Sequence, residues 1–187
     1  MYKFVKNLIL KKYFLLYKPF LFFLTCFFGT YILLTFFYQL FLNGFENGKV
    51  DTITRWVAQN TEEIISWFYQ SIHVEESSNA PFFSVYFQNK IVAQIVEGCN
   101  SISVIILFVS FIVAFSGGLK NTLVFIFGGS LLIYIMNVIR IALLTVLVYY
   151  FPNNLHLLHS ILFPLIIYGL VFILWVIWVN KFSKYAK

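Results

Sequence analysis

Cys99, Arg140 and His159 are residues of catalytic type that lie within or beside long apolar segments of this sequence. A cysteine thiolate is a nucleophile, and a positive neighbour or a helix N-terminus favours that form. A histidine exchanges protons near neutral pH, and an arginine donates hydrogen bonds to a developing oxyanion. Together these residue types have the chemistry of acyl transfer, and His156 is an alternative to His159.

Each of these residues also has an ordinary structural interpretation. A free cysteine is usually a small buried hydrophobic residue, which we expect of Cys26 and which stays an alternative for Cys99. Arg140 can pair with a loop carbonyl or with Glu97, and His159 can be a polar residue at the membrane interface. The residue types alone leave both interpretations open.

The composition predicts an integral membrane protein. Of the 187 residues, 61% are hydrophobic and 11% are charged. Soluble domains carry about 25% charged residues, so this chain has too few polar groups to cover a surface in water. Two cysteines exclude a disulfide-dense scaffold and a Cys-rich zinc site, and no motif indicates a metal or a cofactor. The net charge of +6 resides on residues that flank apolar runs, which argues against a nucleic-acid partner.

Four apolar runs predict an all-α integral membrane fold, because a helix needs about 20 apolar residues to span the bilayer core. Turn residues separate the last three runs, at 116–121 and 151–154. Gly128 and Gly129, inside the third helix, indicate close packing against a neighbour. We expect the four transmembrane helices at 19–42, 101–115, 121–150 and 155–179.

The charge distribution predicts that both termini face the cytoplasm, since Lys and Arg are retained on the cytoplasmic side of short loops. Basic residues without acids occupy 1–18, the turn at Lys120 and the C-terminal tail. All seven acidic residues lie in 43–98, which we therefore expect outside the cytoplasm. The remainder, 99–187, is expected to form a catalytic core that ends in a basic cytoplasmic tail.

The extracytoplasmic segment 43–98 is expected to have structure of its own. Apolar residues from Ile53 to Ile72 recur at steps of three and four, which predicts an amphipathic helix. This helix lies either in the headgroup zone or on the outer ends of the bundle. The runs 82–87 and 91–96 flank a polar turn and are candidates for a β-hairpin that leads to Cys99.

This topology places the candidate residues in the outer leaflet. Arg140 lies roughly 15 Å below the outer end of its helix, and His159 lies about 6 Å along the last helix. Cys99 stands at the outer start of the second helix. Three residues that are distant in the sequence are thus expected at a similar depth on three different helices.

The motifs around these residues resemble those of the exosortase and archaeosortase membrane transpeptidases, and the chain is similar to their short exosortase F type. The resemblance extends over about residues 80–180. It implies catalytic roles for Cys99, Arg140 and His159 or His156, with Asn137 and Glu97 in support. The matching segments are Glu97-Gly98-Cys99-Asn100-Ser101-Ile102, Asn137-Val138-Ile139-Arg140-Ile141 and the stretch from His159 to Pro164.

The resemblance implies a membrane-embedded cysteine protease or transpeptidase in the bacterial inner membrane. Such an enzyme cleaves the C-terminal sorting tails of exported proteins through a thioester acyl-enzyme on the periplasmic side, without a cofactor. Its expected partners are exported proteins with a C-terminal motif, a membrane helix and a basic tail. Because many family members are larger, a small accessory membrane protein is a further expected partner.

The alternative from another class is a non-enzymatic membrane scaffold or transport subunit. In that case Arg140 and His159 form a structural polar cluster, and Cys99 is dispensable.

The orientation predicts that positions 120 and 187 face the cytoplasm. In a chain whose two native cysteines are replaced by alanine, Lys120→Cys and Lys187→Cys should react with an impermeant thiol reagent only after the membrane is opened. A Glu63→Cys variant should react in intact cells and serves as the control. Labelling of position 120 or 187 from the periplasm would overturn the orientation.

Overall fold

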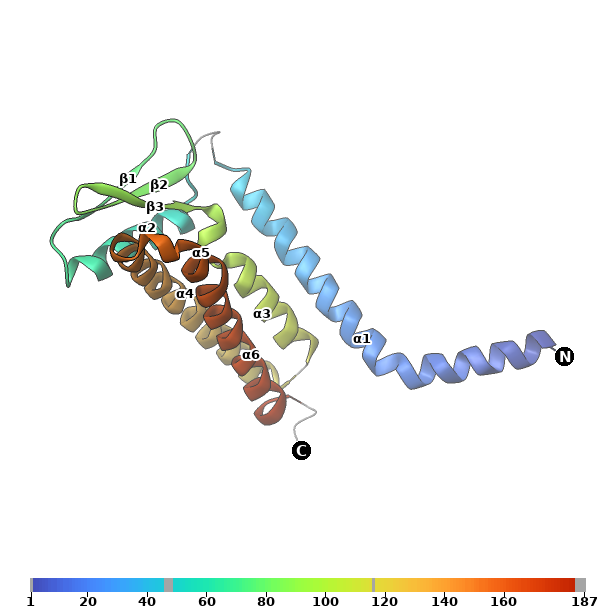
Figure 1. The fold of residues 1–187 in the computed structure, drawn as a ribbon. Helices are drawn as coiled ribbons and strands as arrows, with labels where there is room; N and C mark the ends of the chain where they lie inside the picture. The colour runs from blue at the N-terminus through green and yellow to red at the C-terminus, as the bar shows by residue number, and fades with distance from the viewer. Residues whose placement is uncertain (1, 46–48, 116, 184–187) are drawn as a thin grey trace.

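In the computed structural model, a bundle of helices is covered at one end by a short helix and a small antiparallel sheet (Figure 1). The structure describes residues 2–45, 49–115 and 117–183, with the backbone alone for 2–16. Lys184 and Lys187 of the expected basic tail, Glu46 and the turn residue Ser116 lie outside the described residues. The C-terminal end of the last helix lies at the end of the bundle opposite the sheet (Figure 1).

Three helical segments in the described residues are long and apolar enough to cross a membrane, so three of the four expected spans are supported and the remaining one is not confirmed. They are Tyr17–Leu42, Leu119–Tyr150 and Pro152–Lys181. The run expected to form the second span is α3, Ile102–Ala114, which has 13 residues. At the α-helical rise it is about 20 Å long, against about 30 Å for the bilayer core.

Helix α1, Tyr2–Leu42, includes the segment expected as a separate basic N-terminus. Pro19 lies inside the helix, where the missing N–H and the ring favour a kink, and α1 bends in its N-terminal part (Figure 1). Large apolar side chains of α1 such as Phe22 and Ile32 are exposed, as suits a lipid-facing helix. Its inner side contacts α3, where the rings of Phe23 and Phe115 lie 4.7 Å apart.

Helices α3, α4 (Leu119–Tyr150) and α6 (Phe163–Lys181) form the centre of the bundle. Gly129 of α4 faces the ring of Phe108 in α3 so closely that a Cβ at this position would collide with it. The close packing that the sequence predicted at Gly129 is therefore confirmed. Trp178 of α6 is fully buried, and its Nε1 donates a 3.0 Å hydrogen bond to the carbonyl of Phe115.

The capped end of the bundle is formed by residues 49–99, which we call the cap. Its helix α2, Thr52–Ser66, begins after Asp51, whose Oδ1 accepts 2.9 Å hydrogen bonds from the backbone N–H groups of Ile53 and Thr54. Val57 and Ala58 are fully buried against the sheet and α4. The amphipathic helix therefore packs on the bundle, and it ends before Ile72, which belongs to a strand.

The cap also contains an antiparallel sheet of order β1-β2-β3, whose strands β2 and β3 lie at the two runs given above as candidates for a β-hairpin. Strands β2 (Phe82–Phe87) and β3 (Lys90–Val96) are joined through Gln88 and Asn89, both at positive φ, as a two-residue hairpin turn requires. Strand β1, Ile72–Glu76, was not expected. Alternate residues of β2 are buried against α2 and α4, which fixes the face of the sheet.

The chain after α4 is irregular before it becomes a regular helix. Pro152–Asn154 form a 3-10 turn, η2, which is followed by the short helix α5, Leu155–Leu157. A π-helical turn, η3, covers Leu158–Leu162 and leads into α6. π-helical turns widen the spacing of neighbouring side chains and are frequent at functional sites.

The Gly129 contact predicts that Gly129→Ala destabilises the protein by about 1–3 kcal/mol, because Phe108 must move to admit the methyl group. Gly128→Ala is the matched control, since a Cβ there has no heavy atom within 4 Å. Thermal unfolding of both variants in detergent should show a lower Tm for Gly129→Ala and an unchanged or higher Tm for Gly128→Ala. Equal Tm values would contradict this contact.

Candidate active site

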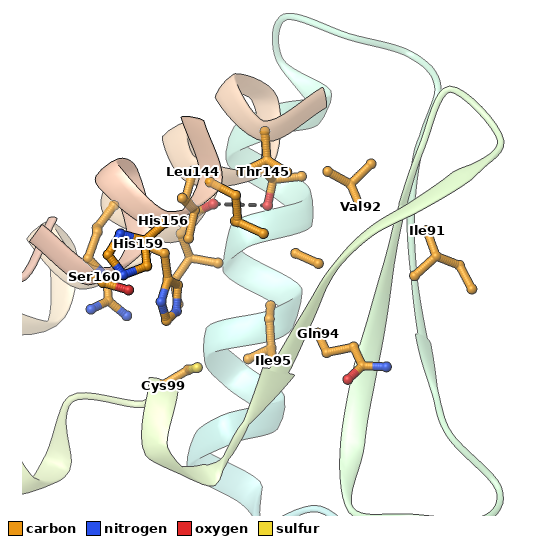
Figure 2. A pocket seen from close by; sticks show the side chains of 15 residues that line it. Ile91, Val92, Gln94, Ile95, Cys99, Leu144, Thr145, His156, His159 and Ser160 are labelled. Carbon is orange, nitrogen blue, oxygen red and sulfur yellow. Dashed lines mark hydrogen bonds between the residues drawn. The ribbon is translucent and has the colours of Figure 1, made fainter. Parts of the chain in front are cut away.

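A cavity of about 610 Å³ lies where the cap meets the bundle. Strand β3 and the turn after it form one wall, α4 forms the second, and the α5–η3 segment forms the third (Figure 2). The residues of catalytic type that line it are Cys99, Arg140, His156, His159 and Ser160. This volume is in the range of small-molecule ligand pockets, about 300–1,000 Å³.

Cys99 lies at the end of the 3-10 turn η1, Glu97–Cys99, just before α3 rather than inside its first turn. It is partly buried and not disulfide-bonded, and its sulfur points toward the cavity (Figure 2). Asn137 of α4 donates a 2.7 Å hydrogen bond from Nδ2 to the backbone carbonyl of Cys99. Because Asn137 is buried, this bond connects the cysteine turn directly to α4.

Asn100, to which the sequence analysis gave no role, connects the same turn to three other elements. Its Nδ2 donates hydrogen bonds to Tyr38 Oη of α1 at 2.7 Å and to Thr54 Oγ1 of α2 at 3.1 Å. Its Oδ1 accepts from the N–H of Ile102, at the start of α3, at 3.0 Å. An Asn two residues before a helix is a known turn and capping signal, which is the sequence feature that indicates this residue.

The backbone at Ser101 is in the left-handed region, with φ 63°. Such a conformation is uncommon for a residue other than glycine and persists where the surroundings hold it. Here the side chain of Asn100, the residue before Ser101, accepts a hydrogen bond from the N–H of Ile102, the residue after it. The same side chain is held in place by its bonds to α1 and α2. The sharp turn directs the chain from β3 into α3 and leaves the Cys99 side chain facing the cavity (Figure 2).

Arg140 lies on α4 one turn after Asn137 and lines the cavity with a half-buried side chain. Within the described residues, the ion pairs join Arg55 to Glu76 and His73 to Glu62, and none involves Arg140. Its buried Nε has no hydrogen-bond partner there either. The structural pairing with Glu97 or a loop carbonyl is therefore not observed, and Arg140 keeps unused donor capacity at the cavity.

His156 of α5 and His159 of η3 both line the cavity, and both are exposed. They are three residues apart on one helical face, and they lie above Cys99 in the view of Figure 2. The structure thus brings Cys99, Arg140 and both histidines to one cavity. The two histidines remain alternatives for one role.

Glu97 is exposed in η1 and does not line the cavity. Partial desolvation raises the pKa of its carboxyl group above the ordinary value, and the negative charge of Asp51 raises it further. Glu97, itself part of the cap, is thus affected by the carboxylate of Asp51 at the start of α2, and among the described residues no ion pair joins it to Arg140. Of the two residues expected in support, Asn137 contacts the cysteine turn directly and Glu97 does not contact the cavity.

The fold and the cavity define a class of protein: a multi-span membrane protein that collects a cysteine, an arginine and two histidines at one end of its helical bundle. A comparison with protein families matches residues 12–179 to the transmembrane exosortase family. The chain belongs to this family, which confirms the resemblance seen in its motifs. Comparisons with curated proteins and with solved structures gave no match.

The bond from Asn137 to the Cys99 carbonyl predicts that Asn137→Ala lowers the free energy of unfolding by about 1–3 kcal/mol, because it leaves a carbonyl without its partner. Ser110→Ala is the control, since the buried Ser110 hydroxyl bonds only the Ile106 carbonyl of its own helix. Denaturant unfolding in detergent should show the larger loss for Asn137→Ala. Equal losses would show that the bond does not hold the turn.

Proposed function

We propose that this protein is a membrane-embedded cysteine protease or transpeptidase that cleaves the C-terminal sorting tails of exported proteins. The observation that carries the proposal is that Cys99, Arg140, His156 and His159 line the same cavity. Membership of the transmembrane exosortase family supports the same reaction class.

The reaction follows from the chemistry of these side chains. The Cys99 thiolate attacks the scissile carbonyl carbon, and the C–N bond breaks as the tetrahedral intermediate collapses to a thioester. His159, or His156 in the same role, gives a proton to the departing amine, so the tail leaves as a neutral amine. An amine or a water molecule then attacks the thioester, His159 accepts the proton from that nucleophile, and the Cys99 thiolate is restored.

We assign oxyanion stabilisation to Arg140. A buried guanidinium nitrogen without a partner is costly in the resting protein, and an acceptor that appears during the reaction removes that cost. A structural arginine in an apolar environment is expected to have its donors satisfied. The free Nε of Arg140 therefore supports a role toward substrate over a structural polar cluster.

We further propose that the cavity faces the periplasm from the bacterial inner membrane, with both chain termini in the cytoplasm. The basic residues that flank the spans support this orientation, and the cap carries the acidic residues of the chain that the structure describes. The partners are exported proteins with a C-terminal motif, a membrane helix and a basic tail. A substrate helix that diffuses in the bilayer presents its outer end to the cavity, with or without an accessory membrane protein.

The proposal predicts that Cys99→Ala abolishes tail removal while the protein stays folded and inserted. Cys26→Ala is the matched control, because Cys26 is the other free cysteine and does not line the cavity. Mass spectrometry of C-terminal peptides from the native host should find uncleaved tails on a set of exported proteins only with Cys99→Ala. Arg140→Ala should slow their removal by about 100-fold or more, as loss of an oxyanion donor does elsewhere.

Two other results would contradict the proposal. Normal tail removal by an inserted Cys99→Ala variant would exclude a cysteine enzyme. Loss of protein level or of a bound partner in Arg140→Ala, with Cys99 dispensable, would instead establish a scaffold or transport subunit.

A further inference from the structure

Strand β3 is an edge strand. It pairs with β2 on one side, and across the described residues no strand pairs with its other side. Unpaired N–H and C=O groups along a strand edge form a ready template for another extended chain. Natural proteins usually cover or disrupt such an edge, so an open one requires a reason.

The unpaired edge of β3 borders the candidate active site. Residues Ile91–Ile95 of this strand line the same cavity as Cys99, and the strand leads through η1 directly to the cysteine. On the opposite side of the cavity are His156 and His159, so an extended chain along β3 lies between the strand and the histidines (Figure 2). The unpaired edge of β3 therefore leads, through the short turn η1, to Cys99, the proposed nucleophile.

The strand has exposed apolar side chains at its two ends and one irregularity between them. Ile91 and Val96 are 59% and 42% exposed, which leaves apolar side chains at both ends of the strand uncovered. The register with β2 shifts between Val85 and Tyr86, which places an irregularity in β3 at Val92. Bulges are over-represented at sheet edges and next to active sites, where they re-aim a side chain or end the pairing.

We propose that the unpaired edge of β3 binds the extended segment that precedes the membrane helix of a substrate tail, by addition of a strand to the sheet. This inference deepens the proposed function and rests on it. Main-chain hydrogen bonds give affinity in this binding mode, and pockets for alternate side chains give specificity. At about 3.3 Å per residue, the stretch from Ile91 to Ile95 faces about four or five substrate residues.

Strand addition has a periodic signature, because only every second residue of the added strand bonds the edge in either direction. The test replaces single backbone amides of a semisynthetic tail by esters, which removes one N–H at a time. The tail is taken from a protein that stays uncleaved in the Cys99→Ala strain, and cleavage is measured with the full-length enzyme in liposomes.

Esters at alternate positions should reduce kcat/KM by about two- to tenfold each, and the positions between them should have little effect. An ester effect that is uniform, or absent from the residues before the scissile bond, would exclude strand addition.

A crosslinking experiment tests which edge of the sheet binds the extended segment of the substrate tail. A photoreactive amino acid replaces Gln94 of β3 or Glu75 of β1, the edge strand on the other side of the sheet, in the Cys99→Ala enzyme. Both residues are exposed. Gln94 should crosslink to the few residues before the membrane helix of uncleaved tails, and Glu75 should not.

The two failures are distinguishable. If no tails remain uncleaved in the Cys99→Ala strain, the proposed function fails. If tails remain uncleaved but Gln94 crosslinks no more than Glu75, the function holds and the assignment of the β3 edge is wrong.

Discussion

The position of Cys99 depends on side-chain amides at a junction where regular backbone structure stops. The strand before it ends at Val96 and the helix after it begins at Ile102, so between them the backbone forms only the short 3-10 turn η1, closed by a 3.2 Å bond from the Asn100 N–H to the Glu97 carbonyl. Asn137 holds the Cys99 carbonyl, and Asn100 connects the turn to α1, α2 and α3. The amide nitrogens of both residues donate to buried or part-buried acceptors, and such networks favour one arrangement because alternatives leave polar groups without partners.

A buried apolar cluster beside this junction packs the cap against the bundle. Val57 and Ala58 of α2, Val85 and Ile95 of the sheet and Val138 of α4 belong to one buried cluster. Val138 follows Asn137 in α4, so the apolar cluster and the amide bond to the cysteine turn meet on one helical turn. The wall that carries Cys99 and the wall that carries Arg140 are thereby fixed relative to each other.

The sequence predicted much of the candidate site but less of the architecture around it. Arg140 and the two histidines were candidates because ionisable side chains are expensive in lipid, whereas Cys99 was a candidate because of its thiol chemistry and the motif around it. Asn100 had no assigned role, because its partners Tyr38 and Thr54 are distant in the chain and only the fold brings them near. Strand β1 was missed because Ile72 also continues the helical spacing of the preceding segment, and the π-helical turn at Leu158–Leu162 has no local signal of its own.

The short length of α3 has a consequence for the supply of water. Its 13 residues place Cys99 about 20 Å from the opposite end of that helix, while the 32 residues of α4 extend about 48 Å. Cys99 therefore lies beside the length of α4, near Arg140, rather than at the end of that helix. Under the proposed function, a nucleophile that resolves the thioester reaches Cys99 through the cavity, so the polar lining of the cavity would influence the balance between hydrolysis and transfer to an amine.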